Sequence, residues 1–426
     1  MALNDSESDL TFGVELEAIG FFRVLNEGDD VNDSFIRDAW PGYILVPYEL
    51  EHRAGIYAVQ QMIDILRSHN VDINNFDHSV VGPPYPSPPS AEPTRHSPNC
   101  ANPLYHRWTL KRDASVRLLQ DVDDHMSDIT DSLIDNPGRR VGYLALELIS
   151  PAVKASSVDD MVEVFTVIEH FQGLFKLHVN STTGLHVHVG MGRRWFTAQW
   201  LNQIAALTWA ADAILTYVHP DHRRNNHYCM RNRIHSQLAA GMTAAQAMDG
   251  ASSSFVYVQG SPCPTTEEGA WEIGRCNTSN QIGRLMHVPP AMGPAYNFDN
   301  YFPEPSRRGG KTTIEFRQAA GSISPEWVCH WAAICIGVCR YAIFHMDWQF
   351  FDHTLVVRCD SVDAGTEPFN EPLDIFLREI GCAASSLFIM AHSHDQRLSR
   401  NGPTMDPQPG PRARRRRRRP GPDLLS

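Results

Sequence analysis

Two histidines that share one face of a predicted strand are the first candidates for chemistry. Residues 182–190 read TTGLHVHVG, in which His186 and His188 alternate with apolar residues. Successive side chains of a β-strand point to opposite faces, so both imidazoles project from one face and the apolar side chains from the other. Two imidazoles at this spacing can reach one ligand, although core or surface histidines with ordinary partners would show the same pattern.

Three other segments repeat this alternation with charged residues. The charged residues are Glu15 and Glu17 in FGVELE, Glu147 in YLALELI, and Glu315 and Arg317 in TTIEFR. Ionisable groups two residues apart, opposite apolar ones, are typical of an antiparallel sheet whose reverse face packs on a core.

If these strands are neighbours, one sheet face carries four carboxylates, two imidazoles and one guanidinium. Carboxylates crowded in this way repel one another and take up protons unless cations lie among them. Each motif alone has a plainer explanation, such as the wet face of a sheet or a cross-strand ion pair. The conjunction of widely separated strands with the same plan predicts a metal site.

Helical segments between these strands would position them. Residues 49–69 and 157–174 show apolar residues at steps of three and four, and the second segment begins with a pattern that resembles a capping box. A helix rich in Ala and Leu is predicted over residues 197–218. Ser324 followed by Pro325 predicts the start of another helix, which reaches about Phe344.

Composition predicts a globular protein whose main domain does not bind nucleic acid. The chain has 426 residues, of which 42% are hydrophobic, enough for a large core. The last 26 residues carry seven arginines and two acids, which leaves 30 basic and 47 acidic residues, a net charge of −17, in residues 1–400. Nucleic-acid binding relies on a basic surface that neutralises phosphates. The acidic net charge of residues 1–400 therefore argues against nucleic-acid binding.

We expect an intracellular, cytoplasmic protein without a membrane span. Nine scattered cysteines without a CxxC pair predict reduced core thiols, and neither a zinc knuckle nor a disulfide framework. The first ten residues, MALNDSESDL, are polar and acidic where a secretory signal would be basic and then apolar. The longest apolar run, residues 327–344, contains His330 and Arg340 and predicts a buried helix.

Three segments stand apart from one predicted domain over residues 1–400. Residues 82–103 are a proline-rich insertion, and residues 252–294, rich in Gly, Pro, Ser and Asn, are expected to be an irregular insertion. Residues 401–426 include six consecutive arginines at 414–419 and are expected to form a disordered tail. Nuclear import or polyanion binding is the alternative for this tail.

Four motifs, in this order, resemble those of the putative amidoligases, a family of glutamine synthetase-like carboxylate–amine ligases. They are FGVELE at 12–17, ELISP at 147–151, GLHVHVG at 184–190 and TIEFR at 313–317. Residues 108–115 and the cluster around Arg223 also fall where that family has similar residues. The resemblance covers about residues 10–345, and it identifies the superfamily without identifying the substrate.

The resemblance implies an α+β fold in which a curved, mainly antiparallel sheet forms the active-site face and helices pack on the other face. It implies ATP as cosubstrate and two or more Mg²⁺ or Mn²⁺ ions. By position, the implied metal ligands are Glu15, Glu17, Glu147, His186 and Glu315. Among these, Glu15, His186 and Glu315 would hold the metal on the ATP phosphates, and the other two the metal nearer the carboxylate substrate.

The remaining roles follow from the same resemblance. His188 would lie along the nucleotide, Arg317 would contact the transferring phosphate, and Arg223 would hold the acid substrate. Arg317, Glu315 and Glu17 are therefore the predicted catalytic residues. Oxygen-rich ligands suit Mg²⁺ or Mn²⁺, and a single imidazole favours tolerance of Mn²⁺.

Amide formation from a carboxylate agrees with this residue set. A carboxylate is a poor electrophile, and its conversion to an acyl phosphate supplies a good leaving group for an attacking amine. That step brings an anionic acid to an anionic triphosphate, so cations must neutralise both and an arginine must take up charge on the moving phosphoryl group. The substrate would be a small molecule or peptide with a carboxylate, joined to ammonia, an amino acid or a protein lysine.

Two other classes stay open. A metal-dependent hydrolase could use the same histidines and glutamates with an activated water. A catalytically inactive nucleotide-binding relic is the second alternative, although none of the named ligand positions has been lost. Oligomeric state is also open, since glutamine synthetases build their sites between subunits.

The segment GGKT at 309–312 echoes the end of a phosphate-binding P-loop, but we reject that assignment. The first glycine of the motif would fall on Pro305, and the segment leads into a predicted strand where a P-loop leads into a helix. Lysine is otherwise scarce, with Lys111, Lys154, Lys176 and Lys311. We therefore expect phosphate binding to depend on arginine and metal.

Overall fold

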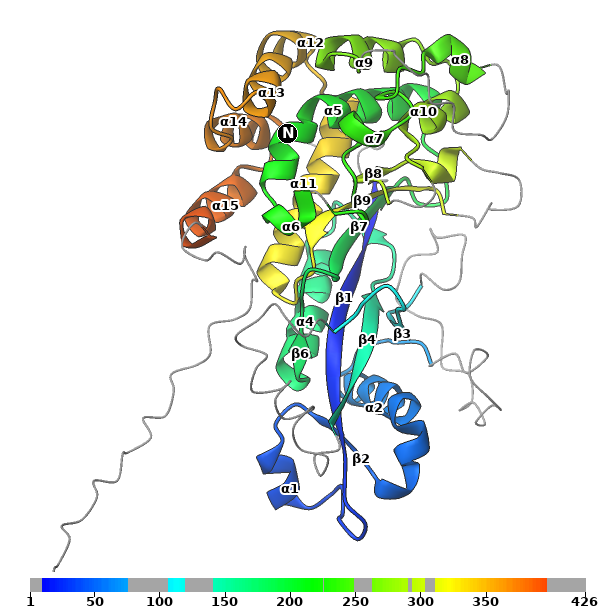
Figure 1. The fold of residues 1–426 in the computed structure, drawn as a ribbon, viewed down its shortest axis with the longest axis vertical. Helices are drawn as coiled ribbons and strands as arrows, with labels where there is room; N and C mark the ends of the chain where they lie inside the picture. Colours follow the sequence, from blue (N-terminus) through cyan, green and yellow to red (C-terminus); the bar gives the residue numbers. More distant parts are fainter. Residues whose placement is uncertain are drawn as a thin grey trace, which may run out of the picture.

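The computed structural model describes residues 10–75, 106–118, 141–224, 226–248, 263–289, 293–302 and 311–396. Within them the chain forms a nine-stranded, mainly antiparallel sheet together with helices (Figure 1), which confirms the α+β prediction at this level. The predicted proline-rich insertion and arginine-rich tail lie outside the described residues.

The long strand β1 (Thr11–Val24) is the centre of the sheet (Figure 1). The strand order is β3 (Thr109–Arg112), β4 (Val141–Ile149), β1, β7 (Gly184–Gly190), β9 (Thr313–Ala320) and β8 (Tyr296–Asn297). Three short strands also pair with β1: the parallel β2 (Ile44–Val46) and the antiparallel β5 (Val153–Lys154) and β6 (Leu177–His178). The predicted charged segments are thus β1 itself, its neighbours β4 and β7, and β9, which pairs with β7.

The apolar positions of these strands share one face. Leu16 lies opposite Leu148 on β4 and Leu185 on β7, and Val187 lies opposite Phe316 on β9. All five are at most 1% exposed and belong to one core cluster. Because the side-chain period of a strand is two, the intervening charged residues project from the reverse face.

Three helices cover the apolar face. They are α2 (Ala54–Ser68), α4 (Val158–Leu174) and α11 (Pro325–Phe344), and their buried side chains join the same core cluster. The predicted helix starts are confirmed: the Ser157 side chain accepts from the Asp160 N–H, and Ser324 accepts from the Trp327 N–H with Pro325 in the first turn. The helices thus pack on the apolar face of the sheet, and the charged residues project from the opposite face.

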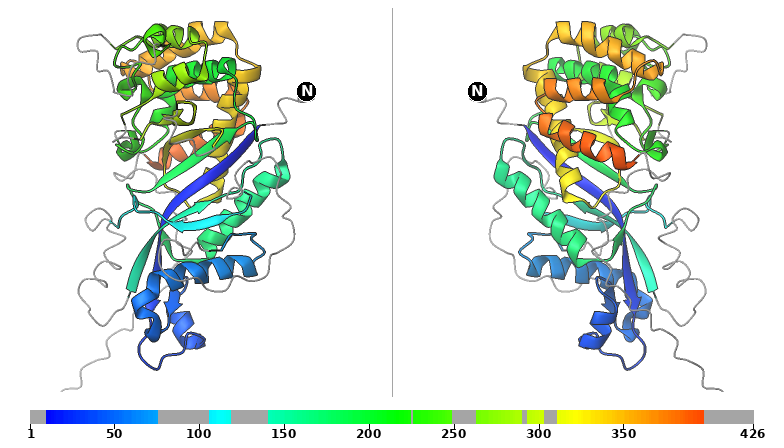
Figure 2. Two further views of the ribbon diagram at one scale, coloured as in Figure 1. Left: turned by 90° about the vertical axis from the view of Figure 1, so that its right-hand side faces the viewer. Right: turned by 90° about the vertical axis from the view of Figure 1, so that its left-hand side faces the viewer.

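A second group of helices surrounds α5 (Ala198–Tyr217), which is buried along most of its length. Its predicted start is confirmed, because the Thr197 side chain caps the Trp200 N–H. It contacts α9 (Thr266–Gly274), α10 (Ser279–Met286), α11 and α13 (Val356–Asp363). Figures 1 and 2 show this group at one end of the sheet and α2 near the other.

The prediction of an irregular insertion over residues 252–294 was wrong for its described part. Both α9 and α10 begin with a full capping box, formed by Thr265 with Glu268 and by Thr278 with Gln281. The Ser, Asn and Gly content suggested loops, whereas the spacing of Thr and Glu or Gln marks helix starts. Both helices pack on α5.

The C-terminal region, residues 348–396, is also largely helical. It contains α12 (Trp348–Phe350), the π-helical turn η7 (Phe351–Leu355), α13, α14 (Asn370–Glu379) and α15 (Ala383–Gln396). The remaining short elements are α1 (Ser34–Ala39), η2 (Tyr48–Arg53), α6 (Asp221–Arg224), α7 (Asn232–His235), α8 (Ala244–Met248) and η5 (Asp299–Tyr301).

The apolar run predicted at residues 327–344 and most of the described cysteines are buried in the core. Among the described helices, α11 alone has the length and composition to cross a membrane, and 72% of its apolar window is buried inside the protein. That degree of burial is typical of a core helix. The eight described cysteines are free thiols, six of them buried.

Candidate active site

Strand pairing brings the predicted site residues onto one face. In antiparallel pairs, directly opposite residues project to the same side of the sheet. Glu15 lies opposite His186, Glu17 opposite Glu147, and His188 opposite Glu315. All six residues are between 3 and 8% exposed. The face is therefore a buried, charged surface built from four strands.

Glu15 occupies the middle of this surface. Its Oε1 lies 3.1 Å from His188 Nε2, and its Oε2 lies 3.6 Å from His186 Nδ1. His186 also lies 3.4 Å from Glu315 through Nδ1 and 3.7 Å from Glu17 through Nε2. The His186 imidazole thus lies within 3.7 Å of three carboxylates.

Two sets of three ligand atoms lie close enough to hold a cation. Glu15, His188 and Glu315 form one set, and Glu15, Glu147 and His186 form the other, with the ligand atoms of each set within 4.8 Å of one another. Glu15 belongs to both. The first set contains His188 where we expected His186, so the assignment of each imidazole to a particular metal stays a prediction.

The donor chemistry fits a hard divalent cation such as Mg²⁺ or Mn²⁺. His186 Nδ1 and His188 Nε2 are buried and make no well-aligned hydrogen bond among the described residues, although they lie 3.6 and 3.1 Å from carboxylate oxygens of Glu15. His188 Nδ1 lies 3.0 Å from Thr313 Oγ1, a contact that orients the ring with Nε2 towards Glu15. Buried polar atoms without partners are costly, and a cation held by these nitrogens and carboxylates would satisfy them.

Glu15 and Glu315 remain ionised. Burial raises the pKa of each, but contacts with the two histidines and with neighbouring basic side chains outweigh this effect. His188, His186 and Lys311 bring the pKa of Glu15 well below its ordinary value, and Arg317 with the two histidines lowers the pKa of Glu315 to about 2. This half of the face keeps its negative charge at neutral pH.

The pKa values of Glu17 and Glu147 are shifted in the opposite direction, upwards. Burial, and then the charge of Asp113, raises the pKa of Glu17 to about 7, although the Gly184 N–H donates to its Oε2 at 2.6 Å. Burial and the charge of Glu15 raise the pKa of Glu147 to about 7. Crowded carboxylates without added cations therefore take up protons here, as the sequence led us to expect.

A β-bulge in β9 sets the position of Arg317. The pairing of β7 with β9 steps from Val187 opposite Phe316 to Leu185 opposite Ala319, so Arg317 and Gln318 both oppose His186. Arg317 turns back to Glu315, with Nη1 2.5 Å from Oε1. The sequence did not reveal this bulge.

Arg223 supports the bulge from α6. Its Nη2 donates to the Arg317 carbonyl at 2.7 Å and its Nε to the Gln318 carbonyl at 3.4 Å. The side chain is 3% exposed. Its guanidinium lies at the Glu17 end of the face, because a Cβ on Gly184 would come within 3.1 Å of Arg223 Nη2 and 3.3 Å of Glu17 Oε2. Contact with an acid substrate stays a prediction for this residue.

Three polar residues on this face received no site role from the sequence. Lys111 Nζ lies 2.5 Å from Glu147 Oε2, Lys311 Nζ lies 3.2 Å from Glu15 Oε1, and the Asn297 amide donates to Glu315 Oε2 at 2.9 Å. Lys111 follows buried Leu110 on β3, an alternation that could have placed it on the charged face. Asn297 lies on a two-residue strand and gave no local signal.

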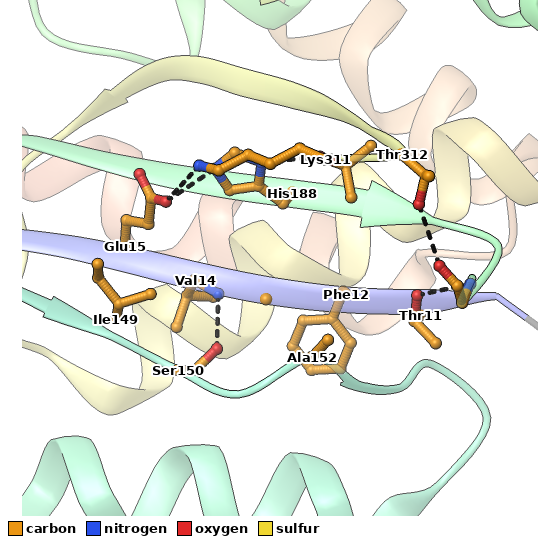
Figure 3. Close-up of a pocket in the computed structure, with 13 residues that line it drawn as sticks. Thr11, Phe12, Val14, Glu15, Ile149, Ser150, Ala152, His188, Lys311 and Thr312 are labelled. Atoms are coloured by element: carbon orange, nitrogen blue, oxygen red, sulfur yellow. Dashed lines mark hydrogen bonds and ion pairs between the residues drawn. The ribbon is translucent and has the colours of Figure 1, made fainter. Parts of the chain in front are cut away.

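A pocket opens at one end of the charged face (Figure 3). It encloses about 570 Å³, part of which is open to solvent, and its lining includes Gly13, Glu15, His188, Lys311 and Thr313. Lys311 and His188 both point to Glu15 in this view. The pocket therefore leads directly to one of the two ligand sets.

The opposite end of the face is closed by apolar side chains. Beyond Glu17, β1 continues with Ile19 and Phe21, which pack with Val116 in a small separate cluster. These three side chains are at most 5% exposed. Glu17 itself is 6% exposed beside this cluster, and its burial raises its pKa.

Comparison with known protein families matches residues 8–249, more than half of the chain, to a family described as putative amidoligase enzyme. The matched range includes β1, β3, β4 and β7 and ends before β9. No curated protein sequence matches the chain significantly.

Proposed function

The chain belongs to the putative amidoligase enzyme family, and on this premise we propose that it is an ATP-dependent ligase that joins a carboxylate to an amine through an acyl phosphate. The family membership supports a ligase in general. The nucleotide, the intermediate and a glutamine synthetase-like form of the sheet are our proposals.

One observation carries the proposal: two ligand sets share Glu15 on a single buried face. Glu15 and His188 line the pocket and form one set with Glu315, and Glu15 forms the other set with Glu147 and His186. Transfer of a phosphoryl group between two anions needs positive charge near both, and two adjacent cations meet that need. A single structural ion would not require a second set of ligands.

The pocket suits the nucleotide. Its lining includes Gly13, which has no side chain and lies opposite His188, so a flat group could rest against the strand at this position. The phosphates would then point to Glu15 and Glu315, with His188 along the nucleotide. Mg²⁺ or Mn²⁺ bound here would neutralise the phosphates and polarise the γ-phosphoryl group.

The protein's own residues would position the reacting groups. Arg317, fixed by Glu315 and by its place in the bulge, would donate to the oxygens of the moving phosphoryl group, where charge develops. The acid would bind with its carboxylate near Glu17 and Arg223, and a carboxylate oxygen would attack the γ-phosphorus and release ADP. The amine would then attack the acyl carbon, and phosphate would leave.

The test is ADP release by the purified protein with Mg²⁺ or Mn²⁺, screened over amino acids and peptides as acids. Hydroxylamine in place of the amine should yield a hydroxamate, the trapped form of an acyl phosphate. Glu15→Ala should abolish both signals, while Asp64→Asn, at an exposed site on α2, should not. Release of AMP in place of ADP, or full turnover by Glu15→Ala, would refute the proposal.

The two rival functions give different results in the same assay. A metal-dependent hydrolase would release product without ATP. An inactive relic would bind Mg·ATP without turnover, so binding and turnover must be measured separately. The intact ligand sets favour an active enzyme over the relic.

A further inference from the structure

We propose that Lys311 exchanges partners during substrate binding: its ammonium group neutralises Glu15 in the metal-free site and moves onto the nucleotide phosphates when a divalent cation takes Glu15. This inference rests on the proposed function. It assigns a phosphate-binding role to a residue whose segment we rejected as a P-loop.

Lys311 stands between the carboxylates and the pocket. Its Nζ lies 3.2 Å from Glu15 Oε1, and its side chain lines the pocket with Gly13 and His188 (Figure 3). The side chain is 32% exposed, whereas that of Glu15 is 9% exposed. The ammonium group can therefore reach both a buried carboxylate and an anion in the pocket.

The main chain directly C-terminal to Lys311 is anchored by hydrogen bonds. Tyr301 Oη donates to the Thr312 carbonyl at 2.8 Å, and Thr312 Oγ1 donates to the Gly192 carbonyl at 3.0 Å. The Asn300 amide donates to the Thr313 carbonyl at 2.9 Å. The backbone thus stays in place while the flexible four-carbon stem allows the ammonium group to move.

Charge makes the exchange necessary. Glu15 is the ligand common to both sets, so a divalent cation on Glu15 would lie within a few ångströms of the Lys311 ammonium group. Like charges so close in a buried site repel strongly. The nucleotide phosphates in the pocket are the anions that come with the metal, and lysine binds phosphate as a mobile point charge.

Lys111 provides a matched comparison. It also pairs with a ligand carboxylate, with Nζ 2.5 Å from Glu147, but it lies on the edge strand β3, separated from β1 by β4. Loss of either lysine should remove a competitor for a metal ligand. Only loss of Lys311 should also remove a contact to nucleotide phosphate.

The experiment measures two affinities by calorimetry in the full chain: Mn²⁺ alone, and a non-hydrolysable ATP analogue at saturating Mn²⁺. Lys311→Met should bind Mn²⁺ alone about threefold more tightly or better, and the analogue about tenfold more weakly. Lys111→Met should also bind Mn²⁺ more tightly but keep the affinity for the analogue. Lys176→Met, at an exposed site, should change neither.

Opposite changes in the two affinities separate this role from a structural one. If Lys311→Met weakens Mn²⁺ and the analogue together, or leaves both unchanged, the exchange is refuted. An equal loss of analogue binding in Lys111→Met would also refute it, because net charge would then explain the effect. Lys311→Gln repeats the test with a polar side chain, and Lys311→Arg should retain analogue binding.

The wild-type protein separates the two proposals. If the wild-type protein does not bind the analogue with Mn²⁺, the proposed function and the Lys311 exchange are both wrong. If it binds the analogue and Lys311→Met binds it equally well, only the exchange is wrong.

Discussion

The two ends of the charged face differ in what lies beyond their carboxylates. At the open end, β1 runs from Glu15 to Gly13, and the pocket gives access to the ligand set. At the closed end, the same strand runs from Glu17 to Ile19 and Phe21, which are sealed by apolar packing. One strand therefore supplies both an entrance and a closed wall.

The electrostatics of the two ends differ in the same direction. Arg317 and the histidines keep Glu315 ionised at the open end, whereas burial raises the pKa of Glu17 and Glu147 to about 7 at the closed end. We expect the open end to accept a cation first, since its ligands are already charged. The closed end should accept a cation with release of protons.

The largest effect is expected from loss of the carboxylate that both ends share. Glu15→Gln removes a charge and a ligand from both sets. We expect ADP release to fall by at least about 10³-fold, because phosphoryl transfer depends on charge neutralisation. Calorimetry should show weak Mn²⁺ binding at both ends. Retained binding at one end would show that Glu15 serves only the other.

Loss of Arg317 should be next in size. Arg317→Ala removes a donor placed for the transition state, so kcat should fall by about 10²- to 10³-fold. KM for ATP should change far less, because the contact forms with the moving phosphoryl group. Steady-state kinetics would test this expectation. A change confined to KM would assign Arg317 to ground-state binding.

Proton uptake at the closed end predicts a dependence on pH. Folded-state pKa values of about 7 for Glu17 and Glu147 exceed the ordinary value, so the folded protein holds protons that the unfolded chain has released. In the metal-free protein, the contribution of these two groups to the free energy of unfolding should therefore be greatest below about pH 4.5. It should fall as the pH rises towards 7, by on the order of 3 kcal/mol per group.

Two measurements check this prediction. Thermal unfolding without metal should show the fall, and Glu17→Gln should reduce it. Mn²⁺ affinity at the closed end should rise about tenfold or more between pH 6 and pH 8, since protonated carboxylates do not bind metal. An affinity that is constant with pH would show that Glu17 and Glu147 are not ligands.

A glycine at the closed end should tolerate a methyl group poorly. A Cβ on Gly184 would lie 2.8 Å from His186 Nε2 and 3.3 Å from Glu17 Oε2. Gly184→Ala should therefore displace these side chains and weaken Mn²⁺ binding about tenfold, at a cost of about 1–3 kcal/mol for the crowding. Calorimetry with a thermal-unfolding control would separate lost affinity from lost fold.

The corresponding glycine at the open end should give the smallest effect. A Cβ on Gly13 would meet Ser150 Oγ at 3.4 Å, an ordinary contact, so the fold should accept Gly13→Ala. The methyl group would narrow the pocket at Gly13. Binding of the ATP analogue should weaken about threefold, with Mn²⁺ binding unchanged. Equal effects of the two glycine substitutions on Mn²⁺ would contradict the difference between the ends.

Local patterns were sufficient for the helix starts that have strong caps and for the faces of the strands. Ser157 and Ser324 cap their helices as expected, and the helix predicted from about residue 197 begins after a Thr197 cap. The capping boxes of α9 and α10 carried an equally local signal that we outweighed with composition. Those two helices were therefore predictable, and the error was one of weighting.

The bulge and the position of Lys311 were not predictable. The bulge depends on how β9 pairs with β7, and Arg223 stabilises it from α6. Lys311 reaches Glu15 across 296 residues of sequence. No local pattern encodes such contacts, because they arise only when strand register brings distant segments together.

The sequence by itself determined which side chains share a face, because the alternation of a strand is a local property of its backbone. It therefore placed Glu15 with Glu17 and His186 with His188. Only the tertiary structure decided which strands are neighbours, where the pocket opens and where apolar packing closes the face. These features depend on long-range pairing, such as the hydrogen bond from Gly184 to Glu17 across 167 residues.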